Sequence, residues 1–373
     1  MKLKNIALGI GFLVAMFSCS MEDDIQSGMD NKEIISEQYA YFDFSLKGTN
    51  GLNTKSQVSD NGKEAATESE SIVTSCFVAI LNGENILASR YYDTDELQVD
   101  ETDRNIYILN KHILIKAPTG NPALTCFAVA NVVDETMQNK LLAATTSAQL
   151  NSIAINGSLT ADKLVKVGSS TLSDYRTTSK TTHDINESGE ELSSIGGIAC
   201  NQVAIQVHQR AAAIEFVGFS LKKKNETTNQ EEILNASDLK LELININTRT
   251  ALTTTGTAAI QTQSSFVGKS TDENVARLYA YENITDQNTS FKIHYTVNGE
   301  PKTTSVFTIK TPDTNGSFTD EKGNKYNENI VANHLYKISV NVVNKSVNVE
   351  VQCTTANWIK NSYDLGDISV TTK

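Results

Sequence analysis

The stretch AYFDFSLK, residues 40–47, alternates between apolar and polar side chains and decides the fold class. Its apolar positions are Ala40, Phe42, Phe44 and Leu46, each two residues from the next. Successive side chains of a strand point to opposite faces, so this spacing predicts a strand with one buried face over 40–46. Turn-forming and charged residues follow, and they predict an exposed loop over 47–70.

Short segments of the same kind continue along the chain. Hairpin signals stand at Asn82-Gly83 and at Asn298-Gly299, between runs rich in β-branched and aromatic residues. The main exception is 134–155, where apolar residues recur at helical spacing behind Asp134, a favourable N-cap. A polar stretch rich in serine and threonine predicts a long loop over 169–194.

Short, regularly spaced strands separated by turn signals are typical of β-sandwiches. We therefore predict an all-β fold of two β-sandwich domains, with one or two short helices inserted in the first. The break is placed near 208–212, which gives domains over 39–210 and 211–373. A chain of 373 residues is long enough for two domains with cores of their own.

The first residues are typical of an export signal. Two lysines precede an apolar run over 6–17, which is shorter than the roughly 20 residues that span a bilayer as a helix. We predict a signal peptide over 1–18. Cys19 stands where a lipoprotein signal places its acylated cysteine, so we predict lipidation at Cys19 and a polar tether over 19–38. This lipid is the membrane contact that the sequence predicts.

The composition argues against several classes of function. The chain has 44 acidic and 32 basic residues and a net charge of −12, and such a surface repels nucleic acid. Its five histidines are scattered without a paired zinc spacing, and we find no nucleophile elbow of the Gly-x-Ser-x-Gly type. We therefore predict neither an enzyme nor a bound metal or cofactor.

Four cysteines follow Cys19, and all of them stand in apolar or alternating, strand-like runs. They are Cys76, Cys126, Cys200 and Cys353. Their spacing fits no metal motif. We favour buried free thiols, and a disulfide stays open for a chain that folds outside the cytoplasm.

Several segments, taken in order along both halves of the chain, resemble the fimbrillin family, the type V pilins of Bacteroidales. They are FAVANVV (127–133), VAIQVHQRAAAIEF (203–216), LYAYENI (278–284), VANHLYKISVNV (331–342) and VEVQCTTANW (349–358). Two positions depart from the family pattern: Ala213 stands where a basic residue is common, and Ala332 replaces an arginine. The acids at 22–24 resemble the tag that sends lipoproteins of these bacteria to the outer cell surface.

The resemblance implies two sandwich domains of the transthyretin type and export as a lipoprotein precursor. In the family a protease cuts the loop after the first strand and removes the lipid together with that strand. The removable strand would be 40–46 here. The cut would follow Lys55, where the family usually has an arginine, and Lys47 and Lys63 are nearby alternatives.

The resemblance also implies that the tail of the next subunit fills the vacated groove, so that subunits join head to tail. Two tail segments qualify as donors. The residues that would enter the groove are Val347, Val349 and Val351 in the first segment, and Tyr363, Leu365, Ile368 and Val370 in the second. The partners would be other fimbrial subunits, the outer membrane through lipidated Cys19, and a receptor on a host or bacterial surface.

Two other interpretations stay open. The lysine at position 55 favours an uncleaved subunit that keeps its lipid and anchors a fimbria to the outer membrane. The other alternative is a monomeric surface lipoprotein that binds a glycan or a host protein. All three interpretations place the chain at the surface of the outer membrane, and the first two place it in a fimbria.

Overall fold

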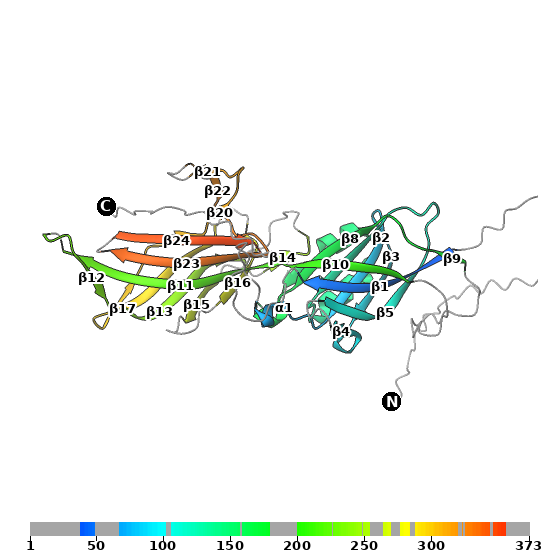
Figure 1. The fold of residues 1–373 in the computed structure, drawn as a ribbon, viewed down its shortest axis with the longest axis horizontal. Helices are drawn as coiled ribbons and strands as arrows, with labels where there is room; N and C mark the ends of the chain where they lie inside the picture. Colours follow the sequence, from blue (N-terminus) through cyan, green and yellow to red (C-terminus); the bar gives the residue numbers. More distant parts are fainter. Residues whose placement is uncertain are drawn as a thin grey trace, which may run out of the picture. The chain divides into compact units, whose positions relative to one another are not determined.

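The computed structural model describes most of the chain after residue 37. The described residues are 38–48, 67–101, 106–156, 159–179, 200–225, 227–247, 249–253, 264–269, 277–283, 288–319, 323, 325–343 and 346–355. Two compact units are distinguished, 1–36 and 37–373, and the described residues all belong to the second. This part of the chain is built almost entirely from strands (Figure 1).

A nine-stranded sheet holds the strands from the first half of the chain. Their order is β3-β2-β6-β8-β10-β1-β5-β4, and β9 pairs with β1. The strands are β1 (Gln38–Gly48), β2 (Cys76–Asn82), β3 (Asn85–Tyr92), β4 (Leu97–Val99), β5 (Ile106–Lys116), β6 (Leu124–Ala130), β8 (Lys166–Leu172), β9 (Thr178–Ser179) and β10 (Asn201–Gln209). Apolar residues from both ends of this order share one core, so the sheet curls onto itself.

Two five-stranded sheets hold most strands of the second half. One has the order β12-β11-β23-β24 with β16 on β11, and the other has the order β15-β13-β17-β18 with β19 on β17. The strands are β11 (Ala211–Lys224), β12 (Glu231–Leu234), β13 (Ser237–Ile246), β15 (Ser264–Lys269), β16 (Arg277–Tyr281), β17 (Ser290–Val297), β18 (Glu300–Thr303), β19 (Phe307–Thr308), β23 (His334–Val343) and β24 (Ser346–Thr355). Apolar side chains of both sheets form one core, which is the arrangement of a β-sandwich.

Smaller elements complete the described fold. β7 (Ala154–Asn156) pairs with β14 (Arg249–Ala251), and β20 (Thr311–Pro312), β22 (Lys325–Asn327) and β21 (Phe318–Thr319) form a three-stranded sheet. The helical elements are α1 (Glu68–Ser71), η1 (Thr94–Glu96), α2 (Glu135–Ala143), α3 (Ser147–Ser152) and η2 (Ala161–Lys163). The predicted all-β sandwich architecture with short helices is confirmed.

The predicted helical segment forms two helices with separate caps. The Asp134 side chain accepts a hydrogen bond from the backbone N–H of Thr136, as expected for the N-cap of α2. Thr146 caps α3 in the same way, by accepting from the backbone N–H of Gln149. Met137, Leu141 and Leu150 are buried in a core that also contains Phe77 and Val129 from β2 and β6. The two helices therefore cover the outer face of these strands.

The turn predictions hold for both hairpins, with one shift. Asn298 and Gly299 both adopt a positive φ and join β17 to β18, as expected for a type I′ turn. In the first hairpin the two loop residues are Gly83 and Glu84, one position later than predicted, because Asn82 pairs with Asn85.

Both predicted loops were too long. β8 occupies 169–172 and β9 occupies 178–179, so these parts of the 169–194 loop were wrong. The strand pattern is hidden in β8 because its middle is Gly-Ser-Ser, with little apolar alternation. The 47–70 loop was wrong at both ends, since β1 runs to Gly48 and α1 begins at Glu68.

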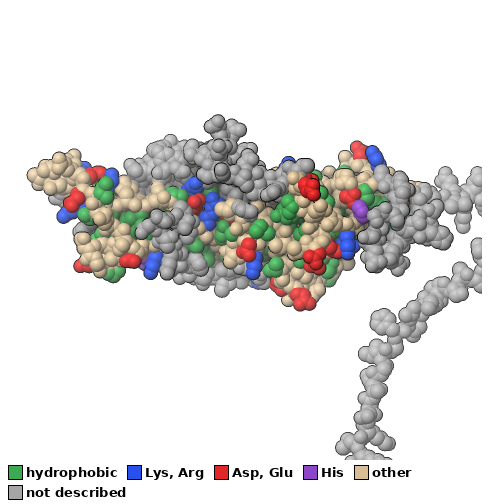
Figure 2. All heavy atoms as spheres, turned by 60° about the horizontal axis from the view of Figure 1, so that its bottom comes forward, with side chains coloured by type: hydrophobic (Ala, Val, Ile, Leu, Met, Phe, Trp, Pro, Cys, Tyr) green, Lys and Arg blue, Asp and Glu red, His purple; other side chains and the backbone are tan. Residues whose placement is uncertain are grey.

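The described surface carries both signs of charge. Figure 2 shows acidic and basic side chains interspersed over one face of the described residues, with small apolar areas between them. Among the described residues, no helix is long and apolar enough to cross a membrane.

Candidate functional site: the seat of the first strand

β1 lies inside the nine-stranded sheet rather than at its edge (Figure 1). It pairs in parallel with β10, from Phe42 opposite Asn201 to Gly48 opposite Val207. On its other side it pairs antiparallel with β5, with a register shift between Phe42 and Phe44. Both edges of β1 are therefore hydrogen-bonded, although these partner strands come from distant parts of the chain.

The predicted apolar face of β1 is buried in the core of the curled sheet. Phe42 and Phe44 are 0% and 1% exposed, and Ala40 and Leu46 are buried to the same extent. The Phe42 ring centroid lies 6.4 Å from that of Phe44 and 6.0 Å from that of Tyr175. Burial of a large apolar side chain contributes about 1.5–3 kcal/mol. We call the groove between β5 and β10 that β1 occupies its seat. Burial of the three large residues of this face therefore contributes roughly 4.5–9 kcal/mol of free energy to holding β1 there.

The opposite face of β1 is more mixed than the alternation predicts. Asp43 and Ser45 are half-buried and Lys47 is exposed, as expected. Tyr41 stands between Ala40 and Phe42, so the alternation puts it on this face, but it is only 4% exposed. Its main-chain carbonyl accepts a hydrogen bond of 2.9 Å from the side chain of Asn201 at the start of β10. The segment that covers this end of β1 comes from 160 residues later, which explains why the local pattern missed it.

Asn201 fixes the end of β10 against β1 through three hydrogen bonds. Its Nδ2 donates to the carbonyl of Tyr41 at 2.9 Å and to the carbonyl of Arg176 at 3.0 Å. Its Oδ1 accepts from the backbone N–H of Arg176 at 2.7 Å. Asn201 is 8% exposed, so these bonds satisfy a buried amide and hold Arg176, between β8 and β9, against the start of β10.

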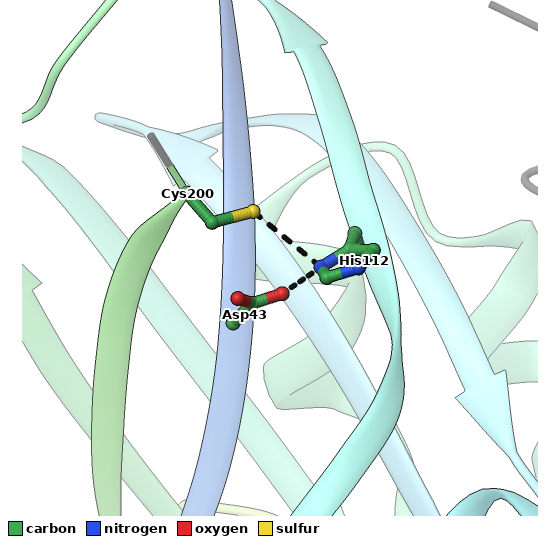
Figure 3. A group of neighbouring side chains, drawn as sticks. All are labelled: Asp43, His112 and Cys200. Atoms are coloured by element: carbon green, nitrogen blue, oxygen red, sulfur yellow. Dashed lines mark hydrogen bonds and ion pairs between the residues drawn. The ribbon is translucent and has the colours of Figure 1, made fainter. Parts of the chain in front are cut away.

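A group of titratable side chains lies on the mixed face, at the middle of β1 (Figure 3). Asp43 of β1 forms an ion pair with His112 of β5, and the Cys200 Sγ lies 3.4 Å from the Nδ1 of His112. Burial raises the pKa of Cys200 and lowers the pKa of His112. The sequence analysis missed this group because its members stand at 43, 112 and 200 and share no local spacing.

The chain beyond the predicted cleavage loop is anchored by Glu70, in the last turn of α1. Its carboxylate is fully buried, lies 2.6 Å from the Arg277 guanidinium and accepts 2.8 Å and 2.6 Å hydrogen bonds from the Tyr279 hydroxyl and the Thr67 N–H. Helix propensity cannot explain a helix of four residues, so this network holds α1 in place.

A buried lysine lies beside this anchor. Lys166 is 2% exposed, and its Nζ donates to the carbonyl of Ile72 at 2.9 Å, immediately after α1. Burial lowers the pKa of Lys166 to about 7, although the negative charge of Glu70 acts in the opposite direction. The start of the chain after the loop is thus held by a carboxylate on one side and by an amine on the other.

The donor candidates are only partly within the described residues. Val347, Val349 and Val351 lie in β24, opposite Val342, Val340 and Ile338 of β23. All ten residues of β24 pair with β23. Cys19, Lys55, Tyr363, Leu365, Ile368 and Val370 lie outside the described residues.

The segments that carry the family resemblance serve the fold. Asn131 adopts a φ of 63°, and its amide donates to the carbonyls of Ile72 and Leu164. Asn283 donates to the carbonyl of Asn245, and Asn333 accepts a hydrogen bond from the backbone N–H of Gln209. Arg210, between β10 and β11, donates to the carbonyl of Ala251. These residues hydrogen-bond to main-chain groups at corners between strands.

Comparison with solved structures identifies the architecture. The chain is similar to a fimbrilin from Porphyromonas gingivalis, with a TM-score of 0.52 and 13% identity, over 86% of this chain and 98% of the other. The chain has the fimbrilin fold. It is also similar to two candidate cell-adhesion proteins from Parabacteroides distasonis, with TM-scores of 0.52 and 0.50 and identities of 14% and 12%. These alignments cover 87% and 86% of this chain and 98% and 99% of the others.

Comparisons of the whole sequence add no relative to those found by structure. No protein-family model matches the sequence, and no curated protein matches it either. At identities of 12–14%, the similarity concerns the course of the backbone. The predicted resemblance to fimbrillins is confirmed at the level of the fold, whereas a mode of assembly has to be inferred from the residues of this chain.

Proposed function

We propose that this chain is a structural subunit of a surface fimbria, and that it joins other subunits by exchange of the first strand. The observation that carries the proposal is the seat of β1, an interior strand with a fully buried apolar face and a hydrogen-bonded neighbour on each side. The fimbrilin fold supports it. We further propose export as a lipoprotein acylated at Cys19, passage to the outer surface, and division into domains over 39–210 and 211–373.

Loss of β1 would create a site that demands a replacement strand. The facing edges of β5 and β10 would lose their main-chain partners, and the apolar core residues that β1 covers would be exposed to water. Unpaired strand edges attract another strand, and alternate pockets select its side chains. A donor from a second subunit repeats the same contact at its own open seat, so the contact does not close and a filament grows.

Loss of β1 would leave the rest of the fold anchored. The first described element after the proposed cut is α1, whose Glu70 is held by Arg277 and Tyr279. A cut after Lys55 would therefore separate β1 from a chain that is still fixed at α1 by buried polar contacts. Because of this anchor, cleavage of the loop would not need to unfold the nine-stranded sheet.

Two donors remain in competition, and each has one observation in its favour. Val347, Val349 and Val351 keep the strict two-residue spacing of the β1 apolar face. However, withdrawal of β24 would break a ten-residue ladder with β23. Tyr363, Leu365, Ile368 and Val370 could enter a groove without that loss, although their spacing changes by one residue between Leu365 and Ile368. A chain truncated after Thr355 separates the two, because only the second donor is removed.

Mass spectrometry of the chain purified from cells tests the proposal. We expect a mature N-terminus near Ser56, no acyl group, and SDS-resistant ladders. The Lys55→Ala variant should keep the precursor N-terminus and stay monomeric. Lys140→Ala, at an exposed lysine of α2 outside the predicted cleavage region, is the matched control and should assemble normally. A wild-type chain that keeps a lipidated Cys19 and forms no ladder would overturn the proposal.

The alternative of an uncleaved anchor rests on the lysine at position 55. In that case the wild-type chain keeps its lipid, and fimbriae made by other subunits are found attached to the cell. Replacement of Cys19 by alanine would then release fimbriae into the medium. Fimbriae that stay attached to cells with this variant would exclude the anchor role.

A further inference from the structure

Two strands and the residue that precedes a third bring three metal-ligating side chains together at the middle of β1 (Figure 3). Asp43 comes from β1, His112 comes from β5, and Cys200 immediately precedes β10. One ligand atom of each residue lies within 4.8 Å of the other two. All three side chains are half-buried, so the group is sheltered by the sheet while one side stays open to solvent.

His112 cannot form hydrogen bonds to Asp43 and Cys200 at the same time. Both the Sγ of Cys200 and the Oδ1 of Asp43 face the same ring nitrogen, Nδ1. A neutral imidazole nitrogen carries either one proton or one lone pair, so it serves one partner at a time. The Oδ1 of Asp43 is buried and is paired with this same nitrogen, so it competes with Cys200 for one ring atom.

The same geometry argues against a nucleophile triad. In such a triad the histidine uses one ring nitrogen for the nucleophile and the other for the carboxylate. Here the thiol and the carboxylate converge on Nδ1. A cation placed between the three atoms would instead use each of them once, as three ligands of one centre.

We propose that Asp43, His112 and Cys200 form a binding site for a zinc-class divalent cation. Zinc accepts sulfur, nitrogen and oxygen ligands together in tetrahedral sites, whereas calcium and magnesium prefer oxygen alone. Bonds of about 2.3 Å to sulfur and about 2.0–2.1 Å to nitrogen put these two atoms about 3.5 Å apart in a tetrahedron. The observed separation between Sγ and Nδ1 is 3.4 Å. Water would occupy the fourth position on the solvent side.

The surroundings orient the proposed carboxylate ligand. The Nε2 of Gln202 donates a 2.6 Å hydrogen bond to the Oδ2 of Asp43, which leaves Oδ1 directed at the other two ligands. A hydrogen bond to the second oxygen of a metal-ligating carboxylate is a recurrent feature of metal sites. Gln202 stands opposite Asp43 in the β1–β10 ladder, so the strand register itself fixes this contact.

The site is complete only when β1 is in its seat, because β1 supplies one of the three ligands. A bound cation therefore links the first strand to both of its neighbours, β5 through His112 and β10 through Cys200. Ligand binding that is confined to the folded, seated state stabilises that state by mass action. This consequence concerns the intact chain and holds whether or not the strand is later removed.

Metal titration of the intact chain tests the site. After removal of metal by a chelator, calorimetry with zinc should show one ion per chain, and the melting temperature should rise with zinc concentration. Cobalt in place of zinc should give the absorption of a tetrahedral, thiolate-ligated ion. Calcium and magnesium should produce neither effect. A wild-type chain whose cobalt complex lacks the thiolate band would overturn the proposal without any variant.

Variants then assign the ligands. Cys200→Ser and Asp43→Asn should each weaken zinc binding by at least about 100-fold, since loss of an outer-shell partner alone costs about 10–100-fold. His208→Gln is the matched control, because His208 is a half-buried histidine of β10 outside the group, and it should leave zinc binding unchanged. Equal zinc affinity in the wild type and in Cys200→Ser, with the thermal shift retained, would refute the assignment.

Discussion

Replacement of Phe44 by alanine should weaken the seat of β1 by about 3–5 kcal/mol. Phe44 is 1% exposed and lies in the core of the curled sheet, with its ring stacked 6.4 Å from that of Phe42. Loss of the buried ring removes about 1.5–3 kcal/mol of transfer free energy. The cavity adds the remainder, because main-chain bonds to β5 and β10 on both sides prevent β1 from moving inward to fill it.

Native-state hydrogen exchange of the intact chain measures this loss locally. Amides of β1 and β10 should exchange faster by roughly two to nearly four orders of magnitude, since 1.36 kcal/mol corresponds to a factor of ten. Amides of β11 and β23, which belong to a different sheet, should change little. Ser45→Ala, on the opposite face of the same strand, is the control and should stay within about 0.5 kcal/mol.

Two results would refute this reasoning. If Phe44→Ala and Ser45→Ala changed exchange in β1 equally, the apolar face would not be what holds the strand. If β11 and β23 accelerated as much as β1, the sheets would open as one unit and the seat would have no stability of its own. Either result would remove the energetic basis for a strand that can be exchanged separately.

Three further predictions concern the residues around the seat. Glu70→Gln should lower the free energy of unfolding by about 3 kcal/mol in urea denaturation, because Arg277 loses its closer and fully buried carboxylate partner and keeps Glu215 at 3.4 Å. Wild-type stability of this variant would contradict the prediction. Burial lowers the pKa of Lys166 from 10.5 to about 7, so between these values the unfolded chain binds a proton that the folded chain does not. Relative to Lys166→Met, the free energy of unfolding of the wild type should therefore rise by about 1.4 kcal/mol per pH unit between pH 7 and pH 10. A difference that does not change with pH would exclude a buried neutral amine. Gly168→Ala should cost at least about 1–3 kcal/mol in thermal unfolding, because its Cβ would collide with a main-chain carbonyl of β10, whereas Gly218→Ala, with ordinary contacts only, should cost less.

Sequence patterns predicted the features of the fold that neighbouring residues determine. The alternation over 40–46 identified the strand and its buried face, and Asp134 identified the start of α2. Turn residues identified both hairpins, because a positive φ at Gly83 or at Asn298 is a property of a few neighbouring residues. The capping bond of α2 and the turn conformations lie within a few positions of the patterns that predict them, whereas the alternation over 40–46 records only which side chains of β1 are buried.

The remaining features depend on residues far apart in the sequence. The parallel pairing of β1 with β10 joins residues 159 positions apart, and no local signal encodes it. β8 lacks apolar alternation because Gly168 is needed for close approach to β10, and this contact is made only in the folded sheet. The group at Asp43, His112 and Cys200 likewise exists only once β1, β5 and β10 are adjacent.

The energetics of the seat favour exchange of β1 over its simple release. Its three large apolar side chains contribute roughly 4.5–9 kcal/mol, and separate association of a strand costs about 4–15 kcal/mol. Because these ranges overlap, a cut between β1 and α1 would leave the strand held by a small net free energy. A donor with similar side chains, carried by a second subunit, would meet the same pockets and could compete with the released strand for them. The anchor at Glu70 would hold α1 in place after such a cut, and the proposed cation at Asp43 would add resistance until β1 is withdrawn.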